Sequence, residues 1–103
     1  MRFRSIPINN IMQECMRVDG IIVDVRSYDE FRRSHIPMAV NIPVETIEQE
    51  QFSLPKGKYL FVYCRYGGAS SYAARVLANQ GYKVVNTVGG INQYKGALTK
   101  GRY

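Results

Sequence analysis

The sequence predicts an α/β fold, with a mostly parallel central sheet of about five strands and helices on both faces of the sheet. Short runs of β-branched and aromatic residues alternate with segments of helical periodicity, which is typical of parallel sheets. The runs are almost continuously apolar, as expected of strands that are covered on both sides. Turn residues such as Asp19-Gly20 and Gly67-Gly68 separate the segments.

The N-terminal elements are an edge strand, a helix and a buried strand. Residues Phe3–Ile6 predict a short strand at the edge of the sheet. Residues 10–16 place apolar side chains at helix spacing, and Cys15 is expected to pack in the core from this helix. The β-branched run Ile21–Val25 predicts a strand that is buried on both faces.

Three shorter elements follow. A helix is expected at Tyr28–Arg33, because Ser27 and Glu30 have the spacing of a capping box. Residues Ala39–Ile42 predict a short strand, and Glu45–Glu50 predicts a short helix.

The second half of the chain contains the clearest helix. It is expected at Ser70–Gln80, with Ser70 or Ser71 as its cap and Gly81 as its C-terminal stop. The apolar run Tyr59–Tyr63 precedes it and predicts a buried strand. The remaining elements are a strand at Lys83–Thr87 and a helix at Ile91–Leu98.

Length and composition fit one globular domain over residues 1–103. Hydrophobic residues make up 46% of the chain and charged residues 21%, an ordinary globular balance. No apolar run approaches the roughly 18–20 residues of a membrane span, and no signal peptide is expected. Two cysteines suit free thiols and a cytoplasmic location better than a disulfide framework. Two isolated cysteines and one histidine do not have metal-ligand spacing, so neither a metal nor a cofactor is expected.

Charge is distributed unevenly along the chain. The net charge is +6, but all eight acidic residues lie in residues 1–50, whereas residues 51–103 contain eight Lys and Arg residues and no acid. This basic half suits an anionic substrate or an acidic protein partner. Neither a nucleic acid nor a membrane is expected as a partner, because the basic residues are scattered rather than aligned along one helix.

The loop after Tyr59–Tyr63 is the most informative segment for function. Cys64 follows a strand, and ligands of parallel sheets bind at the carboxyl ends of the strands. Gly67 and Gly68 permit a tight turn whose N–H groups converge, and the helix that follows adds partial positive charge. A thiol in this setting ionises more readily than a free cysteine and is a nucleophile, so function is favoured over a core role for Cys64.

The candidate site residues follow from this arrangement. Cys64 is the predicted nucleophile, and Arg65 adds a side-chain charge. The predicted anion-binding loop, acting through its backbone N–H groups, consists of Arg65, Tyr66, Gly67, Gly68, Ala69 and Ser70.

Three blocks of the sequence resemble a single-domain rhodanese-like (sulfurtransferase) module. Residues Ile22–Phe31 and Ser34–Pro43 are similar to the family's stretch D-V-R, E-[FY] and G-H-I-P-G-A-x-N-I-P. Residues Cys64–Ser71 are similar to its C-x-x-G-x-R-S loop, and Gly89–Ile91 to its later G-G-[ILMF]. The resemblance covers nearly the whole chain and implies the fold of that family.

The same resemblance implies a sulfur-carrying mechanism. Cys64 would attack the outer sulfur of a donor such as thiosulfate, form a persulfide, and pass the sulfur to cyanide or a thiol. Ala69 stands where the family often has Arg, which removes one anion-binding side chain. Ser34 and Met38 stand where the family usually has Gly, so a local adjustment of the backbone is expected there. His35 is expected to be structural.

Two alternatives remain open from the sequence. A non-catalytic rhodanese-like module could bind a partner or sense sulfur without turnover, and the absence of Arg at Ala69 is compatible with this. A cysteine phosphatase would need Arg at the position of Ser70 to clamp a phosphate dianion, and the sequence does not supply it.

Overall fold

The predicted parallel sheet is present in the computed structural model, which describes residues 3–101 of the chain. Five strands, all parallel, lie in the order β1-β5-β4-β2-β3. The strands are β1 (Arg4–Pro7), β2 (Ile21–Asp24), β3 (Val40–Asn41), β4 (Tyr59–Tyr63) and β5 (Lys83–Val88). The α/β prediction is confirmed, and the edge strand expected at residues 3–6 is present as β1.

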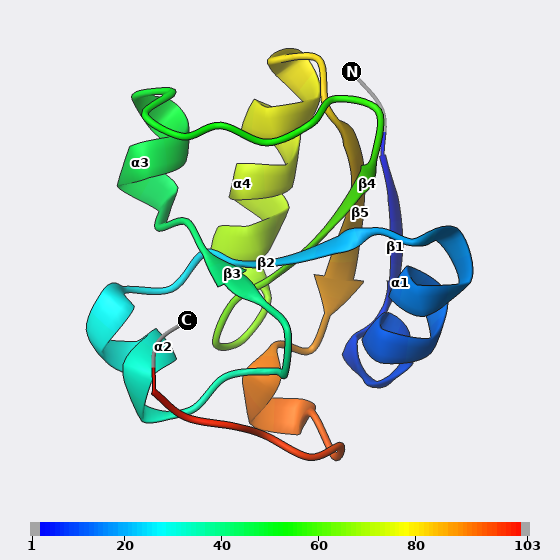
Figure 1. Ribbon diagram of the computed structural model, residues 1–103, viewed down its shortest axis with the longest axis vertical. Coiled ribbons are helices and arrows are strands. Elements are labelled where there is room, and N and C mark those ends of the chain that lie inside the picture. The colour runs from blue at the N-terminus through cyan, green and yellow to red at the C-terminus, as the bar shows by residue number, and fades with distance from the viewer. Residues whose placement is uncertain (1–2, 102–103) are drawn as a thin grey trace.

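Helices cover both faces of this sheet. Figure 1 shows α3 and α4 on one side of the strands and α1 on the other. The helices are α1 (Ile11–Val18), α2 (Tyr28–Arg33), α3 (Val44–Glu48) and α4 (Gly68–Asn79), with 3-10 turns η1 (Ile8–Asn10) and η2 (Ile91–Gln93). Within residues 3–101 we find no helix with the length and apolar character that a membrane span requires.

Each face of the sheet has its own hydrophobic core. Ile47 of α3 and Leu77 of α4 belong to one core together with Val62. Ile11 of α1 belongs to the other core, together with Phe61. Neighbouring residues of β4 therefore serve opposite cores, because successive side chains of a strand point to opposite faces. Burial on both faces explains the continuous apolar run of this strand and fixes the position of its carboxyl end.

The capping box that predicts α2 is formed. The Glu30 N–H donates to Ser27 Oγ at 3.2 Å, and Ser27 Oγ donates to Glu30 Oε1 at 3.3 Å. The expected bounds of the helix, Tyr28–Arg33, are confirmed. This cap fixes the Glu30 carboxylate at the start of α2.

The main helix α4 begins earlier than expected, so the prediction of a serine cap is wrong. Its N-cap is Gly67, with a left-handed φ of 117°, and Ser70 already lies in the first turn. The Ser70 hydroxyl donates to the Gly67 carbonyl at 3.2 Å. Glycine adopts this φ without steric cost, so the chain turns directly from β4 into the helix. The stop at Gly81 is confirmed, with a φ of 97°.

The helix expected at residues 91–98 is wrong beyond its first turn, because only η2 (Ile91–Gln93) forms. Asn9 Oδ1 accepts the Lys95 N–H at 2.7 Å. Asn9 Nδ2 donates to the Gln93 carbonyl at 3.1 Å. One side chain from the start of the fold thus occupies two backbone groups that would continue this helix.

Candidate active site

Cys64 lies directly after β4, where its sulfur faces the start of α4. The Gly67 N–H donates to Cys64 Sγ at 3.0 Å, and the Ser70 N–H donates to the same sulfur at 3.1 Å. The residue is only 3% exposed. Two amides of the predicted loop therefore point inward at the sulfur, as the sequence predicts for a stabilised thiolate.

The remaining amides of the loop are arranged around the same point. The N–H groups of Gly68 and Ala69 belong to the first turn of α4, which has no acceptors for them within the helix. Both residues line a hollow that opens beside Cys64. The aligned peptide dipoles of α4 add partial positive charge at this end of the helix. An anion in the hollow would thus meet backbone donors and a favourable dipole.

A second glycine turn, at Gly89-Gly90, supports the cysteine loop through backbone hydrogen bonds. The Ile91 N–H donates to the Cys64 carbonyl at 2.8 Å, and the Asn92 N–H donates to the Arg65 carbonyl at 3.1 Å. A Cβ at Gly90 would lie 2.2 Å from the Arg65 oxygen, and Gly90 has a φ of 68°. Sequence reasoning placed Gly89-Gly90 only as a turn and as part of the resemblance. Its role as a support for the cysteine loop depends on a close approach that spacing alone does not reveal.

The hollow beside Cys64 has a volume of about 280 Å³. It is small enough to suit a donor of a few atoms or the end of a larger one. Its lining residues are Arg26, Cys64, Arg65, Tyr66, Gly68 and Ala69. The structure therefore brings the predicted site residues together, adds Arg26 to them, and places Gly67 and Ser70 behind the sulfur.

Arg65 does not present a free charge to this hollow. Its Nε lies 3.3 Å from Glu30 Oε2, and the guanidinium lies over the Tyr66 ring at 5.7 Å. The second half of the chain contains no acid, but the carboxylate comes from α2 in the first half. The side chain expected to add positive charge is therefore largely neutralised by a partner from another element.

Arg26 is locked in a buried polar network. Its Nη2 lies 2.8 Å from Asp24 Oδ2 and donates to the Ser34 carbonyl at 2.5 Å. Tyr63 Oη donates to the same Asp24 oxygen at 2.6 Å and accepts the Ile36 N–H at 3.1 Å. Burial, together with the charge and hydrogen bond of Asp24, raises the pKa of the Tyr63 phenol well above its usual range. Asp24 and Arg26 thus pair beside the hollow as part of the scaffold.

His35 has a structural position, as expected. It is fully buried, its Nδ1 lies 2.7 Å from the Phe31 carbonyl, and its ring stacks on Phe31 with centroids 3.7 Å apart. Its backbone forms an antiparallel bridge with Thr99. Of the two positions where Gly is usual, Ser34 has an extended φ of −172°, so only Met38, with a φ of 70°, has the expected adjustment.

Cys15 packs in the core from α1, as predicted. Burial raises the pKa of its thiol. Both cysteines are free thiols. Within the described residues, no cluster of three or more His, Cys, Asp or Glu side chains could hold a metal ion.

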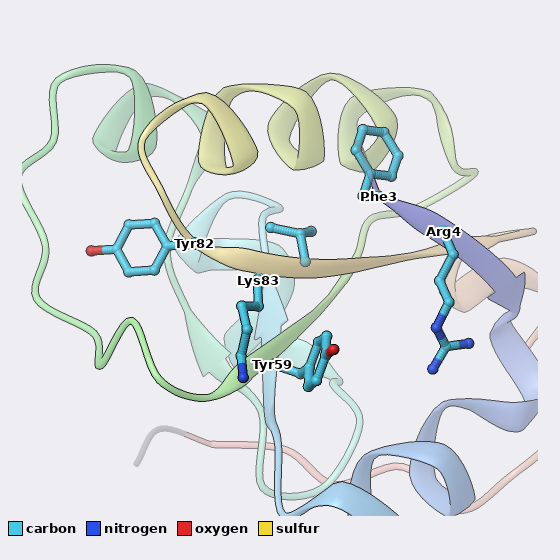
Figure 2. A pocket seen from close by; sticks show the side chains of 6 residues that line it. Phe3, Arg4, Tyr59, Tyr82 and Lys83 are labelled. Atoms are coloured by element: carbon cyan, nitrogen blue, oxygen red, sulfur yellow. The ribbon is translucent and has the colours of Figure 1, made fainter. Parts of the chain in front are cut away.

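A second hollow lies at the other end of the sheet, around the amino ends of β4 and β5 (Figure 2). It has a volume of about 490 Å³. Lys83 lies over the Tyr59 ring at 4.6 Å, and Lys56 lies over the Tyr82 ring at 5.1 Å. Figure 2 shows Arg4 on the neighbouring strand β1. This basic and aromatic surface is remote from Cys64, since the strands are parallel and Cys64 follows the carboxyl end of β4.

Comparison with known proteins points to one family. The model of the Rhodanese-like domain family matches residues 8–97. A tRNA sulfurtransferase from Desulfurococcus amylolyticus is 37% identical over 84 residues, which are 82% of this chain and 17% of that protein. A sulfurtransferase from Allochromatium vinosum is 36% identical over 74 residues, which are 71% of this chain and 69% of that protein.

Solved structures agree with the sequence matches. A rhodanese-like domain protein from Staphylococcus aureus superposes with a TM-score of 0.83 at 27% identity. The match covers 95% of this chain and 98% of the other. The family match over residues 8–97 includes β4, the strand that leads into Cys64.

Proposed function

Because the chain belongs to the rhodanese-like domain family, we propose that it is a sulfurtransferase that carries sulfane sulfur as a persulfide on Cys64. The observation that carries this proposal is the pair of N–H donors from Gly67 and Ser70 on the Cys64 sulfur. Donors of this kind stabilise negative charge on sulfur, and the thiolate is the nucleophilic form of cysteine. The relatives named as sulfurtransferases support the same activity.

The transfer has two displacement steps. The Cys64 thiolate attacks the outer sulfur of a donor such as thiosulfate, the S–S bond of the donor breaks, and sulfite leaves with the electron pair. A thiophilic acceptor, either cyanide or a thiolate, then attacks the terminal sulfur of the persulfide and restores the Cys64 thiolate. Each step exchanges one bond to sulfur for another, so the two-step reaction needs no external oxidant and no general base.

The loop from Arg65 to Ser70 would hold the charged intermediates. The Gly67 and Ser70 amides already contact the sulfur, and Gly68 and Ala69 line the hollow where a terminal persulfide sulfur would extend. Tyr66 gives the hollow an apolar wall. In this assignment Cys64 is the catalytic residue and the loop is the substrate-binding element.

We further propose that the chain forms one domain in the cytoplasm and that it binds an acidic protein partner. Arg4 and Lys83 line the second hollow (Figure 2), and Lys56 lies over the Tyr82 ring beside it, so this surface supports an acidic partner. Free thiols suit a reducing compartment. The tRNA sulfurtransferase match, which spans 17% of that protein, is compatible with a sulfur-carrying part of a larger system.

Intact mass spectrometry tests the proposed reaction directly. The purified chain is incubated with concentrated thiosulfate, weighed, and weighed again after cyanide is added. We expect a gain of one sulfur that cyanide removes as thiocyanate. In Cys64→Ala the rate of thiocyanate formation should fall by about a thousandfold or more, the scale on which loss of a nucleophile acts.

Cys15→Ala is the matched control, because it removes the other thiol and leaves the Cys64 loop intact. This variant should load and release sulfur at the wild-type rate. Absence of Cys64-dependent loading with any sulfane donor would reject the sulfurtransferase proposal and favour the non-catalytic binding or sulfur-sensing module.

A further inference from the structure

The cationic side chains around the Cys64 hollow are already paired with carboxylates. Arg26 and Arg65 are the two basic residues that line it. Arg26 is held by the fully buried carboxylate of Asp24 at 2.8 Å, and Arg65 is held by Glu30 at 3.3 Å. Each added positive charge is thus matched by a negative one, and the hollow gains little net attraction for anions from side chains.

Glu30 is fixed in the position that neutralises Arg65. One of its carboxylate oxygens, Oε1, accepts from Ser27 Oγ at 3.3 Å, and the other, Oε2, faces Arg65 Nε. The Glu30 N–H in turn donates to Ser27 Oγ. Because the cap of α2 orients the carboxylate, Glu30 stays directed at Arg65, which lines the hollow.

The rest of the lining adds no compensating charge. Ala69 and Gly68 have no charged group, and Tyr66 offers a neutral ring. Two of the loop amides are already directed at the Cys64 sulfur. The few backbone N–H groups that remain suit a substrate with one negative charge better than a substrate with two. A dianionic sulfur donor must also approach the Cys64 thiolate against a stronger electrostatic repulsion.

We propose that Glu30 is a specificity-determining residue, which biases the Cys64 site toward sulfane donors with one negative charge and against dianionic thiosulfate. This inference rests on the proposed sulfur transfer and names its class of donor. Glu30 acts through Arg65 and does not touch the reacting atoms.

Two donors with the same chemistry but different charge test this specificity. Cys64 attacks the outer sulfur of either one and breaks its S–S bond. The electron pair leaves on sulfite when the donor is thiosulfate, which has two negative charges. It leaves on methanesulfinate when the donor is the methanethiosulfonate anion, which has one. The persulfide formed on Cys64 is the same in both reactions.

The informative substitution is Glu30→Gln, because glutamine at this position preserves the capping box of α2. Its matched control is Asp29→Asn, which makes the same change in net charge at the neighbouring exposed position. The kcat/KM for each donor is measured with cyanide as acceptor at low ionic strength. For each donor, the kcat/KM of the variant is divided by that of the wild type, which cancels the difference in intrinsic reactivity between the donors.

We expect Glu30→Gln to raise kcat/KM for thiosulfate about two- to fivefold through a lower KM, the range set by the strength of a partly exposed ion pair. Because Coulomb energy scales with donor charge, the gain for methanethiosulfonate should be about the square root of that for thiosulfate. Added salt should reduce both gains. In an Arg65→Gln background the part of the Glu30→Gln gain that comes from freeing the Arg65 side chain should be lost.

Equal changes for the two donors, or equal effects of Glu30→Gln and Asp29→Asn, would overturn the inference and leave sulfur transfer by Cys64 intact. Failure of every variant to form a persulfide from either donor would instead reject the proposed function. Persulfide formation, read by intact mass, distinguishes the two failures.

Discussion

Cys15 and Cys64 have similar exposure but opposite chemical surroundings. They are 6% and 3% exposed, and each lines a hollow. Cys15 lies beside Met12 on α1, where burial raises the pKa of its thiol. The Cys64 sulfur instead accepts N–H groups from Gly67 and Ser70. Two amides are directed at the Cys64 sulfur, whereas at the Cys15 thiol burial outweighs a single backbone hydrogen bond from Gly20.

The largest difference between the two cysteines is expected when a glycine near each of them is replaced by alanine. In Gly90→Ala the new Cβ would lie 2.2 Å from the Arg65 carbonyl oxygen, so the loop must move. Displacement of a reacting group by about 1 Å costs about a hundredfold in rate, and we expect that loss in sulfur loading of Cys64. Loading is measured by intact mass and normalised to the folded fraction from circular dichroism.

Gly20→Ala is the control at the Cys15 end. Its Cβ would lie 2.7 Å from the Phe61 ring and 2.9 Å from the Tyr59 carbonyl, so it should lower the free energy of unfolding. The Gly20 N–H donates to the Cys15 carbonyl, far from the Cys64 loop. The folded fraction of this variant should load sulfur within about twofold of wild type, because the loop amides keep their positions. Similar losses in both variants would show that general destabilisation, and not the aim of the amides, governs loading.

Alkylation of the native protein should separate the two thiols by about tenfold or more. Cys64 is expected to react faster with iodoacetamide, because its amides favour the thiolate, whereas burial disfavours the thiolate of Cys15. Peptide mapping after timed quenching gives both rates in one sample. Equal rates under native conditions, with full reaction of both thiols in urea, would contradict the assignment.

The local features of the fold could be predicted from the sequence because they depend on neighbouring residues. The buried strand at Tyr59–Tyr63 follows from its apolar run, and α2 follows from the spacing of Ser27 and Glu30. The cysteine loop was recognised because a strand, two glycines and a helix follow one another in the chain. Each of these signals lies within a short stretch of sequence.

The features that were missed depend on contacts between distant residues. Asn9 ends the last helix by bonding to Gln93 and Lys95, and no local signal marks it. The ion pair between Glu30 and Arg65 joins α2 to the cysteine loop, so the charge expected from Arg65 is neutralised. Sequence patterns thus predict the cysteine loop but not the ion pair beside it.

Ala69→Arg adds a positive charge beside Cys64 and leaves the surroundings of Cys15 unchanged. Ala69 is exposed and lines the hollow, so an arginine has room to reach a bound anion without burying its charge. A charge-assisted hydrogen bond should lower KM for thiosulfate about threefold to tenfold. Ala69→Gln, which adds a polar side chain without charge, should change KM less. An unchanged or higher KM in Ala69→Arg would show that the missing side chain does not limit binding.

The smallest effect concerns pH and stability at the Cys15 end. Burial raises the pKa of the folded Cys15 thiol, so the stability that depends on its protonation is present below the usual cysteine pKa of about 8.5. That stability is lost as the pH rises, because the unfolded thiol ionises first. Between pH 7 and 9 the free energy of unfolding of the wild type should fall by up to about 1 kcal/mol relative to Cys15→Ala, measured by urea denaturation. A difference between the two proteins that stays constant over this range would show that Cys15 ionises as easily folded as unfolded, and the contrast with Cys64 would then rest on the Gly67 and Ser70 amides alone.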